Sequence, residues 1–158
     1  MPGNMNNPSP LVSVIIVNYN GKQYLKNCLS SLSAQSYPAI EVIFVDNASS
    51  DGSVEYVRKE FPSVRIIESK KNLGFAKGNN LGIREARGEL IATLNNDTEV
   101  SSRWLEELVS AMNSDKKVGM CASKMLFMKD RGMINSTGIC LSRSGTCWDR
   151  GIFEHDEG

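Results

Sequence analysis

The sequence has no surplus of charge of either sign, because 18 Lys and Arg residues balance 18 Asp and Glu residues over 158 positions. Proteins that bind nucleic acid normally carry a basic surplus, so this balance argues against that class. Long hydrophobic runs are also missing, since the segment from Leu11 to Val17 is far shorter than the span of about 20 residues that crosses a bilayer. No signal peptide is recognisable, because residues 1–10 are polar. These absences predict a globular, cytoplasmic protein.

Several short signatures of catalysis or nucleotide binding are absent as well. The sequence contains no GxGxxG, GxxxxGK[ST] or GxSxG pattern, which argues against a dinucleotide-binding domain, a P-loop NTPase and a hydrolase with a nucleophile elbow. The single histidine, His155, lies in an acidic stretch, so a Ser-His-Asp triad is excluded. The cysteines form no CxxC pair and are interpreted as reduced thiols: Cys28, Cys121, Cys140 and Cys147.

Apolar, β-branched runs alternate with amphipathic segments along most of the chain. Strands buried on both faces are expected at residues 11–17 and 41–45, and further strands at 64–67, 90–94 and 118–122. Helices are expected between them, with Asn20 as a candidate N-cap for the first. This alternation predicts an α/β fold with a mostly parallel sheet and helices on both faces. Residues 1–10, rich in Asn and Pro, are expected to form a flexible tail.

Polar side chains gather where the predicted strands end. They form the groups Asn18-Tyr19-Asn20, Asp46-Asn47 and Asn95-Asn96-Asp97. Because parallel strands place their carboxyl ends at one edge, where such sheets bind ligands, we expect these groups to meet there. The Asp97 carboxylate suits Mg²⁺ or Mn²⁺ held together with substrate phosphates. Asn and Asp also begin loops and cap helices well, so for Asn20 and Asn47 a purely structural role is equally open.

The segment from Asn72 to Gly82 carries glycines at intervals of four, at positions 74, 78 and 82. Each glycine inside a helix costs about 0.8–1.0 kcal/mol relative to alanine, so something must approach this helix face closely. We interpret Gly82 as a packing position against the sheet and Gly74 as a position close to a ligand. The start of this helix, with Lys77, could offer N–H groups and a positive charge to phosphate.

Taken together, these motifs resemble glycosyltransferase family 2, the inverting sugar transferases of the GT-A fold, which is Rossmann-like. The rhamnosyltransferase-like branch, concerned with cell-wall or polysaccharide biosynthesis, is the most similar. The resemblance is carried by Ser13 to Asn20, Val45 to Ser53, Asn72 to Gly82 and Leu94 to Asp97. It implies a hexosyl or deoxyhexosyl transferase that takes a UDP- or dTDP-linked sugar and a glycan or lipid-linked acceptor. Such an enzyme would be cytoplasmic or peripheral at the inner face of the membrane.

The resemblance also assigns roles to residues. It implies that Val17 and Tyr19 line the base pocket, that Asp46 holds the base or ribose, and that Asp97 binds the Mg²⁺ or Mn²⁺ ion. Tyr19 could equally be a half-buried aromatic that covers the end of the sheet. The whole nucleotide-sugar-binding set expected here is Val17, Asn18, Tyr19, Asn20, Asp46, Asn47, Asn72, Gly74, Lys77, Asn95 and Asn96.

Two departures from the family pattern matter. Asn95 stands where the family's Asp-X-Asp metal motif has its first Asp, so metal affinity without bound donor should be weak. Family members place the catalytic base well after this motif, and we expect it to lie beyond Gly158. The predicted domains are therefore a nucleotide-sugar-binding domain at 11–122 and an incomplete acceptor-side region at 123–158. A truncated chain of this kind should bind a nucleoside diphosphate but transfer sugar poorly.

Two other functional classes stay open. A nucleotidyltransferase that makes nucleotide sugars usually carries a Gly-rich loop with Arg and Lys after the first strand, where this chain has Asn18 to Lys22. A flavodoxin-like binding module without enzymatic activity is the second alternative. Binding of a diphosphate, a triphosphate or no nucleotide distinguishes the three hypotheses.

Overall fold

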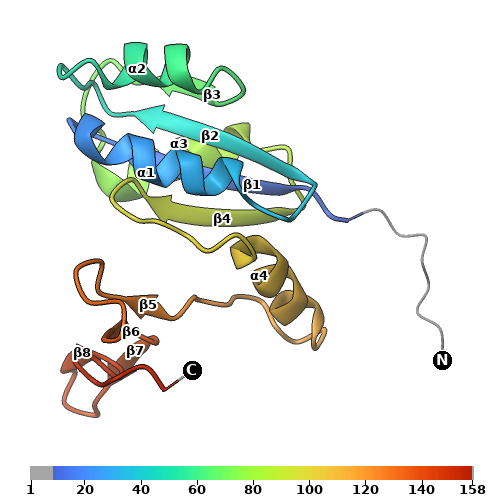
Figure 1. Cartoon of the computed structure of the whole chain (residues 1–158), viewed down its shortest axis with the longest axis vertical. Coiled ribbons are helices and arrows are strands. Elements are labelled where there is room, and N and C mark those ends of the chain that lie inside the picture. The colour runs from blue at the N-terminus through green and yellow to red at the C-terminus, as the bar shows by residue number, and fades with distance from the viewer. Residues whose placement is uncertain (1–8, 158) are drawn as a thin grey trace. The chain divides into compact units, whose positions relative to one another are not determined.

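The computed structural model describes residues 9–157, which fold as two compact units, one up to Leu105 and one from Glu106 (Figure 1). The flexible tail expected for residues 1–10 falls mainly on positions 1–8, which lie outside the described residues. The predicted functional boundary between residues 122 and 123 stays a prediction.

The first unit is built on a parallel sheet of four strands in the order β3-β2-β1-β4. The strands are β1 (Val12–Asn18), β2 (Ile40–Asp46), β3 (Arg65–Glu68) and β4 (Leu90–Asn95). The helices of this unit are α1 (Lys22–Ser33), α2 (Ser53–Glu60) and α3 (Gly74–Glu85). Helix α4 (Trp104–Asn113) begins at the end of the first unit and belongs mostly to the second. Helices α1 and α3 lie on opposite faces of the sheet (Figure 1). The predicted α/β fold is confirmed.

Strand β1 forms the centre of the core because its β-branched residues are covered on both faces. Val14, Ile15 and Ile16 are all fully buried. One face of the sheet packs on the apolar stripe of α1, which buries Leu25, Cys28, Leu29 and Leu32. On the other face, Ile15, Ile43 and Val45 form a cluster against which Leu81 of α3 packs. A run of apolar residues without alternation is therefore what a central parallel strand requires.

The glycines of α3 allow this helix to lie close to the sheet. A Cβ on Gly82 would lie 2.5 Å from Ile15 Cγ2, and one on Gly78 would lie 2.8 Å from Val17 Cγ1. The packing role predicted for Gly82 is therefore confirmed. Gly74 differs, because a Cβ there would meet no atom of the described residues within 4 Å, although its φ of +74° favours glycine.

We expect Gly82→Val to destabilise the first unit by about 1–3 kcal/mol, because the added atoms must displace core side chains of β1 and β2. Denaturant titration followed by circular dichroism measures this change in the free energy of unfolding. Asn80→Val is the matched control, since Asn80 is exposed on the same helix. Equal losses in the two variants would contradict the packing role of Gly82.

The second unit contains short antiparallel strands: β5 (Met125–Leu126) with β6 (Ile134–Ser136), and β7 (Ile139–Leu141) with β8 (Cys147–Asp149). The strand predicted at residues 118–122 is wrong, because this segment pairs with no strand among the described residues, and Met120 is 86% exposed. A short apolar run becomes a strand only where a neighbouring strand can satisfy its backbone. Among the described residues, no helix is long and apolar enough to cross a bilayer.

Candidate functional site

The ends of three neighbouring strands are joined by side-chain hydrogen bonds. The register places Asn18 beside Asp46 and Val17 beside Asn95. Asn96 Nδ2 donates to Asn18 Oδ1 at 2.7 Å, and Asn18 Nδ2 donates to Asp46 Oδ1 at 3.3 Å. The expected meeting of these polar groups is confirmed. The link between β1 and β4 lies where the strand order reverses, the place where open α/β sheets bind ligands.

Asp46 is buried, with 3% of its surface exposed, and it orders the loop that follows β2. Its second oxygen, Oδ2, accepts a hydrogen bond from the Ser49 N–H at 2.8 Å. An ionised carboxylate can accept about four hydrogen bonds, so acceptor capacity remains for a ligand. The role predicted for Asp46, which is to hold a base or ribose, stays a prediction.

The loops after β1 and β2 are fastened to each other. Asn20 donates its N–H to Ser49 Oγ at 2.9 Å, and Asn20 Oδ1 accepts from the Ser50 N–H at 2.8 Å. Asn20 does not cap α1, so this prediction is wrong: Gly21 is the N-cap residue, without a side-chain cap. The reason is that Asn20 adopts a left-handed conformation with a φ of 50°, which turns its amide to the neighbouring loop.

The Asp51 carboxylate serves both helices that begin in these loops. Oδ2 accepts from the N–H of Lys22 in α1 at 2.9 Å, and Oδ1 accepts from the N–H of Ser53 in α2 at 3.0 Å. Burial alone raises the pKa of this carboxyl, but hydrogen bonds from the Ser53 hydroxyl and from these N–H groups outweigh it and leave the pKa below its usual value. Asp51 therefore holds the geometry of both loops.

Asn47 is 2% exposed and fastens the segment that leads into α3. Its Nδ2 donates to the Gly74 carbonyl at 3.2 Å, and its Oδ1 accepts from the Leu73 N–H at 3.4 Å. Asn72 Oδ1 accepts from the Gly74 N–H at 2.8 Å, so this segment forms a tight turn. Asn47 thus has a structural role, whereas the exposed Asn72 and Lys77 have side chains that a ligand can reach.

Tyr19 and Val17 flank the end of β1 in different ways. The Tyr19 side chain is available for stacking, because 53% of this residue is exposed. Val17 is half-buried and packs against the core cluster on the face covered by α3. That Tyr19 and Val17 line the pocket for the base stays a prediction.

The turn after β4 carries Asp97, which is exposed and forms no hydrogen bond or ion pair among the described residues. Burial, and to a lesser extent the Asp97 charge, raises the pKa of the nearby Cys28 thiol to about 12. The described residues hold no group of three or more His, Cys, Asp or Glu side chains that could bind a metal. The donor set therefore fits a divalent cation only if a ligand supplies further oxygens.

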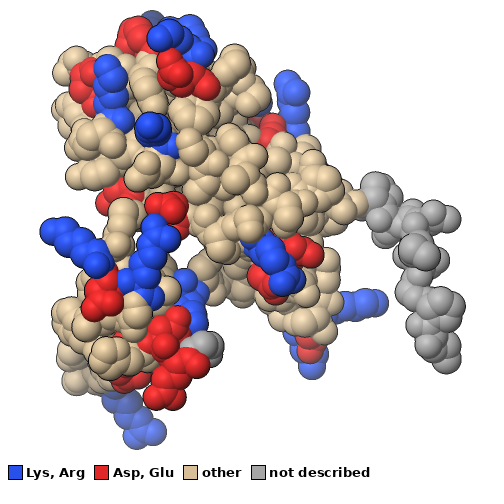
Figure 2. Space-filling model, in the orientation of Figure 1, with Lys and Arg blue, Asp and Glu red and all other residues tan. Residues whose placement is uncertain are grey.

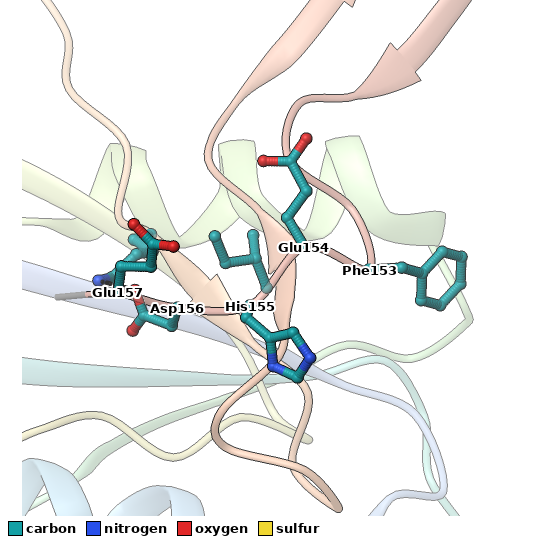
Figure 3. A pocket seen from close by; sticks show the side chains of 7 residues that line it. Phe153, Glu154, His155, Asp156 and Glu157 are labelled. Atoms are coloured by element: carbon teal, nitrogen blue, oxygen red, sulfur yellow. Dashed lines mark hydrogen bonds and ion pairs between the residues drawn. The ribbon is translucent and has the colours of Figure 1, made fainter.

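A hollow of about 640 Å³ lies in the second unit. It is lined by Lys124, Ile134 and residues 153–157. Figure 3 shows that Phe153, Glu154 and His155 project in different directions and do not converge on one point. Lys124 is paired with Asp156, with 2.6 Å between Nζ and Oδ1. The hollow contains none of the residues predicted to bind the donor.

Charged side chains are interspersed on the face of the molecule shown in Figure 2. Arg58 and Glu68, for example, form an ion pair with 2.7 Å between their nearest atoms, and both are more than half exposed. Exposed pairs of this kind contribute little to stability, typically about 0–1 kcal/mol.

Sequence reasoning missed two residues of the strand-end region, Ser49 and Gly21. Ser49 Oγ accepts hydrogen bonds from Asn18 and Asn20, which ties both residues to the loop after β2. Gly21 lies against the Asn18–Asn96 pair, and a Cβ on it would lie 2.2 Å from Asn96 Nδ2. The position of Gly21, directly after the polar residues that end β1, was the sequence signal that could have predicted this close packing.

The known proteins to which this chain is similar include several named as glycosyltransferases. The chain is 33% identical to the glycosyltransferase AglE of Haloferax volcanii over 69% of this chain and 38% of AglE. It is also 33% identical to the uncharacterized glycosyltransferase YibD of Escherichia coli over 78% of this chain and 37% of YibD. The chain thus spans less than half the length of these curated relatives.

A solved structure shares the fold. The mannosyltransferase PcManGT of Pyrobaculum calidifontis, determined in complex with GDP-Man and Mn2+, superposes with a TM-score of 0.66 at 29% identity over 73% of this chain and 36% of that chain. The model of the family named glycosyl transferase family 2 matches residues 13–139, which is most of the sequence. The chain therefore belongs to glycosyltransferase family 2.

Proposed function

We propose that this chain is the donor-binding part of an inverting glycosyltransferase, which transfers a sugar from a nucleoside diphosphate sugar to a hydroxyl of a glycan or lipid-linked acceptor. The observation that supports this most directly is the hydrogen-bonded series Asn96–Asn18–Asp46 at the point where the strand order reverses. It joins the end of β2, with the buried Asp46 carboxylate, to the turn after β4, with the exposed Asp97 carboxylate, through β1, which pairs with both strands. A ligand with a nucleoside at one end and a diphosphate at the other matches that arrangement.

In this proposal each strand end has its own task. Asp46 accepts hydrogen bonds from the base or ribose, and Tyr19 stacks on the base. Asn95 and Asn96 offer amide groups to hydroxyls of the transferred sugar. Asn72, Gly74 and Lys77, at the start of α3, lie at the diphosphate. Asp97 would hold Mg²⁺ or Mn²⁺, and a bound cation would neutralise the charge that develops on the leaving diphosphate. The presence of Mn2+ with GDP-Man in the PcManGT structure supports this last role.

The identity of the donor nucleotide is the most specific part of the proposal. The sequence pattern favours a UDP- or dTDP-linked sugar and the rhamnosyltransferase-like branch, whereas the PcManGT structure holds GDP-Man. The described residues offer amide and carboxylate groups that can bond a sugar or ribose hydroxyl from either donor. Binding measurements with each nucleotide are therefore needed to identify the base of the preferred donor.

Calorimetric titration of the chain with UDP, dTDP, GDP and the corresponding triphosphates, each with and without Mn²⁺, tests the proposal. We expect one diphosphate to bind more tightly with the cation, because the single Asp97 carboxylate needs phosphate oxygens to complete the coordination. A preference for the triphosphate would instead support a nucleotidyltransferase. Absence of nucleotide binding would overturn the proposal in favour of a binding module.

A further inference from the structure

We infer that Asn18 is a positioning residue that couples the Asp46 carboxylate to the turn carrying Asp97. The part of the site that binds the nucleoside and the part that binds the cation would then be held in a fixed arrangement before the ligand binds. This inference rests on the proposed function for its ligand, but the coupling itself is a property of the unliganded chain.

All polar atoms of the Asn18 side chain are used in the structure. Asn18 is completely buried, its Oδ1 accepts from Asn96, and its Nδ2 donates to Asp46 and, at 3.0 Å, to Ser49 Oγ. Reversing the amide would place its oxygen against the Asp46 carboxylate, where neither group can donate. The orientation of Asn18 is therefore fixed by its partners, as expected for a fully satisfied buried amide.

Gly21 provides the space in which this contact forms. A Cβ at this position would lie 2.2 Å from Asn96 Nδ2 and 2.7 Å from Asn18 Oδ1, the two atoms of the hydrogen bond. The φ of Gly21 is −111°, a value that residues other than glycine adopt readily. The need for glycine here therefore comes from the Asn18–Asn96 contact and not from the backbone conformation.

The turn after β4 transmits the position of Asn96 to Asp97. The Asn95 carbonyl accepts hydrogen bonds from the Thr98 N–H at 3.3 Å and from Thr98 Oγ1 at 2.7 Å, which closes the turn around Asn96 and Asp97. The Asn96 side chain links this turn to β1. A change at Asn18 or Asn96 should therefore move the Asp97 carboxylate, although neither side chain needs to touch the cation.

Two variants, Asn96→Ala and Gly21→Ala, remove the link in independent ways. We expect each to weaken Mn²⁺-dependent binding of the preferred nucleoside diphosphate by about tenfold in calorimetric titration, with a smaller change when Mn²⁺ is absent. Gly119→Ala is the matched control, since a Cβ there meets no atom within 4 Å in the part of the chain that the structure describes. Thermal unfolding of each variant confirms that the chain is folded.

A double-mutant cycle distinguishes positioning from a direct contact. In the Asp97→Ala background, Asn96→Ala should change the affinity by less than about twofold, because its effect passes through Asp97. A full, additive loss in that background would overturn the inference. It would also be overturned if both single variants bound like Gly119→Ala.

A second measurement tests the coupling without a ligand. It therefore gives a result even if the chain binds no nucleotide, which is the outcome that would overturn the proposed function. In ¹⁵N–¹H NMR spectra, Asp46→Asn or Ser49→Ala should shift the backbone amide signal of Asp97. The same substitution should leave that signal in place when Asn96→Ala is also present. Equal shifts in both backgrounds would show that the effect does not pass through Asn96, and no shift in either would show that the two strand ends are independent. Either result would overturn the inference.

Discussion

Asp97→Ala is expected to remove the Mn²⁺ dependence of nucleoside diphosphate binding, with a loss of at least about tenfold in affinity at saturating Mn²⁺. Asp97 is exposed after β4, and the described residues contain no larger group of metal-binding side chains that could replace it. Removing its charge leaves the cation with ligand oxygens and water. Calorimetric titration with and without Mn²⁺ measures the effect.

Glu55→Ala is the control for the change in net charge, because Glu55 is an exposed carboxylate on α2. It should retain the Mn²⁺ dependence of the unmodified chain. Asp97→Asn should resemble Asp97→Ala, since the amide keeps the size of the side chain but loses the charge. If metal-dependent binding survives in Asp97→Ala, the cation is held elsewhere and the assignment of Asp97 is wrong.

Asp46→Ala should have two separate effects, on stability and on binding. The free energy of unfolding should fall by about 1–3 kcal/mol, because the Ser49 N–H and one bond of Asn18 Nδ2 lose their acceptor. Nucleoside diphosphate affinity should fall by at least about tenfold with and without Mn²⁺, because a charged hydrogen-bond acceptor for the base or ribose is gone. Chemical denaturation and calorimetry measure the two effects independently.

Asp51→Ala separates these effects, since Asp51 also accepts hydrogen bonds from loop N–H groups but lies outside the Asn96–Asn18–Asp46 series. It should lose stability to a similar degree with a much smaller loss of affinity. Parallel losses of affinity in the two variants would indicate that Asp46 acts only by ordering its loop, and its assignment to the nucleoside would then fall.

The succession of strands and helices along the chain of the first unit could be predicted from the sequence, because it depends on local patterns of apolar residues. The β-branched run in β1 and the apolar stripe of α1 are buried as their spacing predicts. The gathering of Asn18, Asp46 and Asn96 at one edge could also be predicted, because it follows from the parallel direction of the strands. The close approach of Gly82 to the sheet was likewise readable from the spacing of the glycines.

Only the tertiary structure decided which partner each polar side chain takes. Asn47 fastens the entry to α3, Asn20 bonds the neighbouring loop instead of capping α1, and Asp51 supplies the hydrogen bond at the start of that helix. These bonds join residues far apart in the chain, such as Asn18 and Asn96, 78 positions apart. Their formation depends on strand register and on the left-handed turns at Asn20 and Ala48, which no local periodicity encodes.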